Sequence, residues 1–182
     1  MTAAPPQSSV ATVLGEVDAS TLGITLAHEH CFVDQTSYWV RPTDPDRRSI
    51  AEAPIEPSTF GISRFDPLLV RDNLVVSDLD LAVEELALFK EAGGQTVVDL
   101  SVPDLGRNVA ALQVISQRTG LHVVTACGHY VHTAHPTSLT HETVDSIAAR
   151  LIEELMVGID GTGVRPGVIG EIGTSNPIHP NE

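Results

Sequence analysis

The chain has 182 residues, of which 42% are hydrophobic, and its 24 acidic residues outnumber 10 basic ones to give a formal net charge of −14. That length allows one domain with its own core, and no apolar run approaches the roughly 20 residues that cross a bilayer. The acidic balance argues against binding to nucleic acid, whose phosphates would be repelled, and no basic amphipathic stretch indicates a membrane surface. The two cysteines, Cys31 and Cys127, are too few for a disulfide framework, and we expect both to be buried, reduced thiols.

The N-terminal residues 1–9 are small, polar and proline-containing, and they lack the basic start and the apolar stretch of a signal peptide. We expect them to form a disordered leader on a cytoplasmic protein whose domain covers residues 10–182. Residues 10–17 are rich in β-formers and residues 22–26 form a second apolar run, with a turn-like segment at 18–21 between them. This arrangement predicts a short β-hairpin at the start of the domain.

Residues 35–67 show no clear period and are punctuated by Pro and Ser. So long an irregular segment within a domain predicts a functional loop or a lid. Beyond it, apolar runs typical of buried strands alternate with segments of helical period. Strands are expected over residues 95–100, 121–127 and 167–172, and helices after caps at Ser77 or Asp78, Asp104 and Thr140, ending near Gly93, Gly120 and Gly158.

Strands that alternate with helices form a parallel sheet covered by helices, either a doubly wound open sheet or part of a (β/α)8 barrel. Polar residues at the C-terminal ends of the expected strands favour the barrel, because that rim carries the active site of barrel enzymes. These residues are His28 and His30, Asp99, Cys127 and Glu171. Since a full barrel takes about 250 residues, the sequence predicts an α/β fold: the N-terminal half of a (β/α)8 TIM barrel, about four β/α units, preceded by the short hairpin.

His28 and His30 share one face of an extended segment, while Glu29 points away, because side chains alternate along a strand. Two imidazoles about 7 Å apart along a strand can converge on one metal ion. A His-x-His pair also occurs as two structural histidines at a polar strand end, but here it ends a turn-flanked apolar run and is followed by Asp34. Both histidines are therefore candidate metal ligands.

Glu171 lies in an expected strand made otherwise of Gly, Val and Ile, between Gly170 and Gly173. A carboxylate there is unfavourable to bury unless a cation or strong donors meet it. An arginine at the strand end would satisfy it, but the flanking glycines, which allow close approach of backbone or substrate, favour a functional role.

Distinctive motifs follow one another along nearly the whole chain after residue 10: residues 13–15, residues 22–30 with the His-Glu-His triplet, Asp34, and residues 93–99, 106–108, 119–120, 128–130, 158–164 and 167–175. In this order they resemble the phosphotriesterase family of the amidohydrolase superfamily. The resemblance implies a (β/α)8 barrel that holds two divalent metal ions, zinc first, with manganese or cobalt as alternatives. It further implies that His28 and His30 are the first-strand ligands of the more buried ion and that Glu171 bridges both ions.

The bridging residue departs from the organophosphate-degrading members of that family, which use a carboxylated lysine. The single lysine here, Lys90, lies in the helix before the second expected strand. Glu171 resembles the bridge of the phosphotriesterase homology proteins instead, which argues against efficient organophosphate hydrolysis. The implied reaction is hydrolysis of an ester-like bond, a phosphoester or a lactone, by a hydroxide shared between two ions about 3.5–4 Å apart. Glu171 would hold the ions at that spacing.

The other ligands of the family, two histidines on the fifth and sixth strands and an aspartate on the eighth, are expected beyond residue 182, and His179 lies too close to the fourth strand to be one of them. We therefore expect a fragment, a truncated product or one piece of a split protein, weakly active at best alone, that a second chain or a missing C-terminal half completes. The resemblance also implies a homodimer. Two alternatives stay open: a non-catalytic half barrel that binds metal or a partner chain, and an amide or carboxyl-ester hydrolase with the same metals.

Aromatic residues near the expected rim are candidates for contact with a small-molecule substrate. Tyr130 matches a family position near the pocket, and Trp39 and Tyr38 belong to the first loop, where packing onto the rim is an equal explanation. The histidines within residues 129–135 are expected to be solvated, and Arg107 to brace a neighbouring loop.

Overall fold

The structure, a computed structural model, describes residues 8–182. Residues 1–7 of the expected leader lie outside the described residues, and Ser9 is the first residue of a strand. Strands β1 (Ser9–Thr12) and β2 (Gly15–Asp18) pair in an antiparallel hairpin. This hairpin forms within the first apolar run and not, as expected, between the first and second runs. Its turn is closed by Gly15 at φ 117°, a conformation that favours glycine, whereas residues 19–21 form a 3-10 turn.

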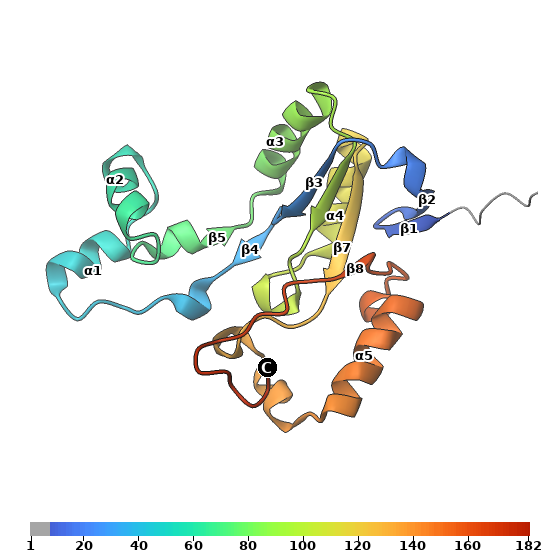
Figure 1. Cartoon of the computed structure of the whole chain (residues 1–182). Helices are drawn as coiled ribbons and strands as arrows, with labels where there is room; N and C mark the ends of the chain where they lie inside the picture. The colour runs from blue at the N-terminus through green and yellow to red at the C-terminus, as the bar shows by residue number, and fades with distance from the viewer. Residues whose placement is uncertain (1–7) are drawn as a thin grey trace, which may run out of the picture.

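Four parallel strands form the main sheet: β3 (Thr25–Glu29), β6 (Thr96–Asp99), β7 (His122–Cys127) and β8 (Val168–Ile169), in the order of the chain. Helices α3 (Leu79–Glu91), α4 (Val109–Thr119) and α5 (Val144–Met156) connect successive strands and pack beside the sheet (Figure 1). This is the predicted strand–helix alternation of half a (β/α)8 barrel. None of the helices formed by residues 8–182 has the length and apolar character that a membrane span requires.

The helices begin at side-chain caps, but two begin later than predicted. Asp78 caps α3, as expected. Asp104 instead lies in a 3-10 turn, and Asn108 caps α4. Thr140 lies in another 3-10 turn, and Thr143 caps α5 through a capping box. In both cases a residue type suited to capping occurs shortly before the one that is used, so local preference alone gives the wrong choice.

The hydrophobic core lies between the sheet and the helices that flank β6 and β7. Val97 of β6 and Val123 of β7 are fully buried and belong to the same cluster as Leu112 and Ile115 of α4. Burying each such side chain stabilises the fold by roughly 1.5–3 kcal/mol. This packing fixes the two central strands, and with them the rim where their C-terminal ends meet.

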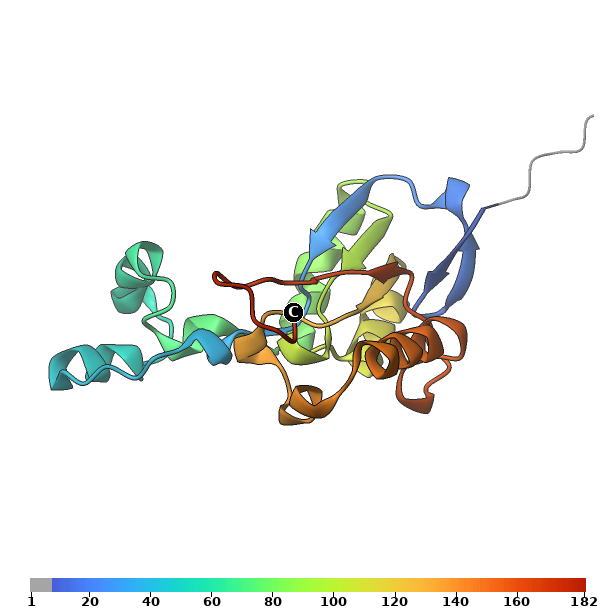
Figure 2. The same cartoon turned by 60° about the horizontal axis from the view of Figure 1, so that its bottom comes forward.

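The segment of residues 35–74, hereafter the arm, contains α1 (Pro45–Ala51) and α2 (Pro57–Phe65), each with proline in its first turn. The arm leaves the sheet after β4 (Val33–Asp34) and returns in β5 (Val75–Val76), and these two strands pair antiparallel. Figures 1 and 2 show it projecting away from the main sheet. The prediction of an irregular loop is therefore wrong, because helices of 7 and 9 residues are too short to give a clear apolar period.

The fourth parallel strand is shorter than predicted. The expected strand over residues 167–172 reduces to Val168–Ile169. The backbone N–H of Gly170 still donates to the carbonyl of Cys127, but Glu171 has a φ of 51° and turns the chain off the sheet. A non-glycine residue in this left-handed region is uncommon, and it raises the energy of the backbone. The turn ends β8 at the point where Glu171 reaches the rim.

Candidate metal centre

The two candidate histidines come from the end of the first parallel strand. His28 belongs to β3 and His30 follows it directly. The pairing of β3 with β6 shifts register between Leu26 and Glu29, an irregularity of the kind that redirects side chains beside functional sites. The imidazole rings of His28 and His30 lie with their centroids 5.4 Å apart, edge to face.

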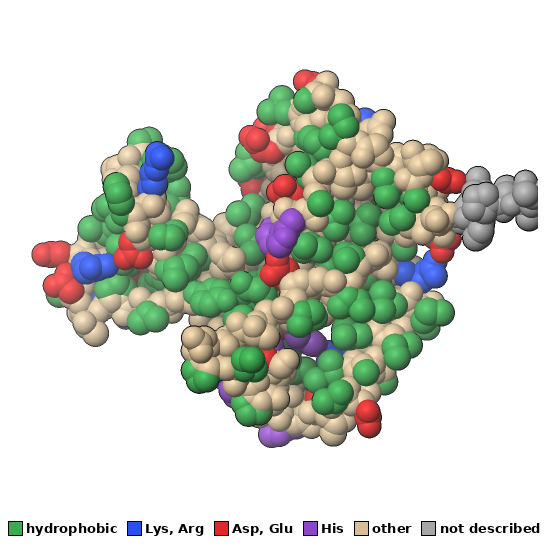
Figure 3. Space-filling view, in the orientation of Figure 1, with side chains coloured by type: hydrophobic (Ala, Val, Ile, Leu, Met, Phe, Trp, Pro, Cys, Tyr) green, Lys and Arg blue, Asp and Glu red, His purple; other side chains and the backbone are tan. Residues whose placement is uncertain are grey.

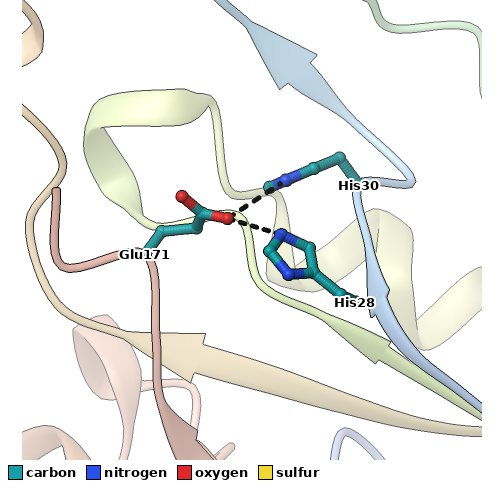
Figure 4. Close-up of side chains that lie close together, drawn as sticks. All are labelled: His28, His30 and Glu171. Atoms are coloured by element: carbon teal, nitrogen blue, oxygen red, sulfur yellow. Dashed lines mark ion pairs between the residues drawn. The ribbon is translucent and has the colours of Figure 1, made fainter.

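Glu171 approaches both histidines from the end of the fourth strand (Figure 4). Its Oε1 lies 2.6 Å from Nε2 of His28 and 3.5 Å from Nε2 of His30. Within residues 8–182 these are the only three His, Cys, Asp or Glu residues whose potential ligand atoms all lie within 4.8 Å of one another. Two segments more than a hundred residues apart in the chain are thus brought together at the rim, as the sequence predicts.

The site is open on one side and covered on the other. The side chain of His28 is 61% exposed, that of His30 is 25% exposed and that of Glu171 is 14% exposed. On the face shown in Figure 3, histidine and acidic side chains adjoin at the surface. Two imidazole nitrogens and a carboxylate oxygen form a donor set suited to Zn²⁺ and to similar divalent ions. The residues present therefore fit the implied metal. Because the site is accessible on the side of His28, a metal ion held there would have room for a further ligand.

A buried hydrogen-bonded unit supports His30 from behind. Nδ1 of His30 lies 3.0 Å from Oγ of Ser101, in the loop after β6. The carboxylate of Asp99, which is 1% exposed, accepts from the backbone N–H of Cys31 at 2.7 Å and from that of Ser101 at 3.0 Å. Burial raises the pKa of the Asp99 carboxyl, although these hydrogen bonds act in the opposite direction. Asp99 was expected as a polar residue at a strand end, but nothing in the sequence pattern indicates Ser101.

Both cysteines are buried and free, as predicted. Burial raises the pKa of the Cys31 thiol, and the nearby Asp99 carboxylate adds to the shift. Burial also raises the pKa of the Cys127 thiol. Neither thiol therefore has the lowered pKa of a reactive nucleophile.

Asp34 is placed apart from the three clustered side chains. It lies on β4, where its Oδ1 accepts from the backbone N–H of Thr36 at 2.9 Å and from the hydroxyl of Thr36 at 2.6 Å. These bonds fold the start of the arm and lower the pKa of the Asp34 carboxyl. Asp34 thus has a local structural contact of its own.

The aromatic candidates separate into two environments. The rings of Tyr38 and Tyr130 meet edge to face, with centroids 6.2 Å apart. Burial raises the pKa of Tyr38, and a hydrogen bond to Tyr130 and the negative charge of Glu171 raise it further. The Trp39 indole N–H instead donates to the carbonyl of Leu69 at 2.9 Å, and the guanidinium of Arg71 lies 6.0 Å from the indole centroid. Tyr38 and Tyr130 are near the Glu171 charge, whereas Trp39 is engaged within the arm.

The histidine-rich segment after β7 is more ordered than expected. Nδ1 of His129 lies 2.9 Å from both carboxylate oxygens of Asp104, and the two side chains are 11% and 1% exposed. His135 uses Nε2 to contact the carbonyl of Tyr130 at 2.7 Å. His132 is exposed and stacks on His179 with ring centroids 3.4 Å apart. The prediction of solvated histidines is therefore wrong for His129, because a buried carboxylate holds its ring.

Arg107 has a bracing role, as predicted, but it holds a helix and a strand and not the expected loop. Its guanidinium donates to both carboxylate oxygens of Glu154 on α5, at 2.8 and 3.0 Å, and to the carbonyl of Ala126 on β7 at 2.9 Å. The side chains of Arg107 and Glu154 are only 3% and 13% exposed. This pair fastens α5 to β7, the strand with which β8 pairs.

Comparison with known proteins places the sequence in a family. Residues 8–182 match the phosphotriesterase family. An N-acetyltaurine hydrolase of Danio rerio is 35% identical over 177 residues, which cover 97% of this chain and 50% of that protein. A phosphotriesterase-related protein of Nematostella vectensis is 33% identical over 174 residues, with 94% of this chain and 50% of that protein covered. The chain spans about half the length of the curated relatives it matches.

Solved structures agree with the architecture. A resiniferatoxin-binding protein from Rhodobacter sphaeroides superposes with a TM-score of 0.91 at 37% identity, over 95% of this chain and 48% of that one. A mutant organophosphorus hydrolase from Deinococcus radiodurans superposes with a TM-score of 0.68 at 26% identity, over 98% of this chain and 48% of that one. The chain belongs to the phosphotriesterase family, and its fold is the N-terminal half of a (β/α)8 barrel.

Proposed function

We propose that this chain supplies part of the active centre of a metal-dependent hydrolase, with His28, His30 and Glu171 as metal ligands. The observation that carries the proposal is the convergence of the two Nε2 atoms on one carboxylate oxygen, at 2.6 and 3.5 Å. Membership of the phosphotriesterase family supports it. The proposed metals are two divalent ions, zinc first, with manganese or cobalt as alternatives.

Each ligand has a distinct part in the proposal. His28 and His30 bind through Nε2, the atom that each presents to Glu171. Both recorded contacts of Glu171 with the histidines use Oε1, which leaves Oε2 of the carboxylate for a second ion. Divalent ions at such sites activate water near neutral pH and polarise the oxygen of the bond to be cleaved. Tyr130 and Tyr38 are the proposed contacts for the substrate, and Trp39 follows Tyr38 in the arm.

The bond to be cleaved has two candidates. The first is an ester-like bond, a phosphoester or a lactone. The second is an amide, favoured because several relatives, including that of Danio rerio at 35% identity, are N-acetyltaurine hydrolases. The same histidines and glutamate serve either reaction, since both need an activated water and a polarised oxygen.

A complete centre of this kind requires further strand–helix units beside β8. Among the described residues β8 pairs only with β7, so its other edge has unpaired backbone groups. Hydrophobic side chains gather in Figure 3 over the area where Figure 1 places α5 and β8. The exposed apolar residues of α5, of β8 and of the segments that follow these two elements are Val144, Ile152, Met156, Val157, Ile169, Ile172 and Ile178. We propose that the second half of the barrel, in the same protein or in a second chain, covers this face and brings the remaining ligands.

The test uses the protein with both halves of the barrel present, loaded with zinc and assayed on a lactone, an aryl phosphotriester and an N-acyl amino acid. We expect bound zinc and turnover of one of the three substrates. A variant with both His28→Ala and His30→Ala should lose both, whereas His141→Ala, an exposed histidine of a 3-10 turn, should keep both. Zinc uptake without turnover would favour the non-catalytic, metal-binding alternative, and an unchanged zinc content in the double variant would overturn the ligand assignment.

A further inference from the structure

Ser101 is the residue in contact with the second ring nitrogen of His30. Its Oγ lies 3.0 Å from Nδ1 of His30 and 2.7 Å from the backbone carbonyl of Phe32. Ser101 is 1% exposed, so bulk water does not compete for these contacts. Its hydroxyl therefore joins the imidazole ring of His30 to the backbone carbonyl of Phe32, two residues further along the chain.

The protons in this chain of contacts can be assigned. A serine hydroxyl has one proton to donate, and a carbonyl oxygen can only accept. The contact with Phe32 therefore uses the Ser101 proton, because the opposite assignment would place two lone pairs 2.7 Å apart. Oγ of Ser101 must then accept from His30, which places a proton on Nδ1 and, in the neutral imidazole, leaves a lone pair on Nε2.

We infer that Ser101 is a positioning residue, which fixes His30 in the tautomer that presents an unprotonated Nε2 to the metal centre. This inference rests on the proposed function, because it assigns a partner to one of the proposed ligands. The lone pair on Nε2 faces Oε1 of Glu171 at 3.5 Å. Two acceptors that face each other without a proton between them are stabilised by a cation, so the tautomer adds a reason for a metal at this point.

The position of Ser101 is itself fixed by a buried carboxylate. Asp99 accepts from the backbone N–H groups of Ser101 and Cys31 with separate oxygens. The loop after β6 and the loop after β3 are therefore joined twice, once through Asp99 and once through the Ser101 hydroxyl. His30 lies between these two links, and turning its ring would break the contact of Nδ1 with Oγ of Ser101.

His28 has different surroundings. Its side chain is 61% exposed, and its recorded contacts within residues 8–182 are with Glu171 and with the ring of His30. Of the two candidate ligands, His30 alone is thus held by a partner outside the cluster of three, Ser101. We expect His30 to provide the preorganised position and His28 to adjust to the ion.

The first test is a tautomer measurement on the unmodified full chain without metal. Long-range proton–nitrogen correlation NMR distinguishes the two imidazole nitrogens, and His30 should carry its proton on Nδ1. A proton on Nε2 would overturn the inference. This measurement needs no variant and no turnover, so it holds whether or not the chain proves to be a hydrolase.

The second test compares two serine variants of the protein with both halves of the barrel by zinc titration against a chromophoric chelator. Ser101→Ala should weaken zinc binding by about 10- to 100-fold, the usual effect of losing an outer partner of a ligating histidine. Ser116→Ala is the matched control, because Ser116 is also buried and its hydroxyl donates to the carbonyl of Leu121 at 2.7 Å, outside the clustered ligands. Equal affinities of the two variants would overturn the positioning role. If the unmodified protein with both halves of the barrel takes up no zinc, the proposed function fails, and the tautomer result stands separately.

Discussion

The histidine side and the glutamate side of the candidate metal centre are held in place by different kinds of contact. His28 lies in a strand of 5 residues paired along β6, His30 follows that strand directly, and the Asp99–Ser101 unit supports His30 from behind. Glu171 follows a strand of 2 residues at the edge of the sheet, in a left-handed backbone conformation. The first side is built by hydrogen bonds inside the sheet, whereas the second depends on how β7 and α5 place the last strand. The site is therefore preorganised on one side and sensitive to distant packing on the other.

The largest expected effect is a loss of stability on the glutamate side when the buried ion pair between Arg107 and Glu154 is broken. Arg107→Ala would leave the Glu154 carboxylate, 13% exposed, without its partner, and removing one member of a buried pair destabilises by about 3–5 kcal/mol. The control is Arg118→Ala, whose pair with Asp80 is exposed at 47% and 77% and contributes only about 0–1 kcal/mol. Urea unfolding of the two variants measures the difference. Equal midpoints would show that α5 is not held by this contact.

Replacing the carboxylate itself tests the glutamate side without changing its support. Glu171→Gln keeps the size of the side chain and removes its charge, so the fold should be retained and zinc binding weakened by more than the roughly 100-fold upper effect of a lost outer partner. Circular dichroism checks the fold and zinc titration the affinity. Wild-type affinity in this variant would mean that the two histidines bind without the carboxylate.

The glycine that lies against the last strand should have a smaller effect. Gly128 has a φ of 141°, and a Cβ there would lie 2.7 Å from the carbonyl oxygen of Gly170, next to Glu171. We expect Gly128→Ala to destabilise the fold by about 1–3 kcal/mol and to weaken zinc binding by moving Glu171. Gly61→Ala in α2 is the control, since a Cβ there meets nothing within 4 Å and a helical alanine stabilises by up to about 1 kcal/mol. The measurements are the unfolding midpoint and the zinc affinity. Equal values for the two variants would contradict the close contact between position 128 and the carbonyl oxygen of Gly170.

The smallest expected effect is a difference in reactivity between the two thiols, that of Cys31 on the histidine side and that of Cys127 on the glutamate side. Burial raises the pKa of both, so less thiolate is present near pH 8 than for a free cysteine of pKa about 8.5. We expect neither to react with Ellman's reagent in the folded protein. In urea below the unfolding transition, Cys127 should be labelled before Cys31, because only the short β8 pairs with its strand on that side. Peptide mass spectrometry gives the order of labelling, and the reverse order would mean that the histidine side opens first.

The same contrast explains how much of the molecule could be predicted from its sequence. The parallel strands and their helices follow from apolar runs and helical period, and the shared face of His28 and His30 follows from the alternation along a strand. Glu171 was recognisable as an acidic residue among apolar ones, although its strand is shorter than predicted. Ser101 was not recognisable, since a hydrogen bond that spans 71 residues leaves no local pattern.

Other differences have equally local causes. The arm was predicted as irregular because helices of 7 and 9 residues provide few turns from which to detect a period. The caps at Asp104 and Thr140 were wrong because each of these residues, although of a type suited to capping, lies in a 3-10 turn that precedes the helix. His129 was predicted to be solvated because its partner, Asp104, belongs to a different loop. Only in the case of His129 is the cause a contact between segments distant in the chain.

The short ladder between β4 and β5 has a consequence for changes of length in the arm. Because Val33 pairs with Val76 and Asp34 with Val75, both ends of the arm are fixed at one place on the rim. When such a segment is lengthened, the entropic free energy of bringing its ends together rises by only about 0.6 kcal/mol for each doubling of its length. A change of length in the arm therefore leaves the proposed ligands on the sheet undisturbed. In the proposed function, one of the substrate contacts, Tyr38, thus lies on a separate piece of the chain from the metal ligands.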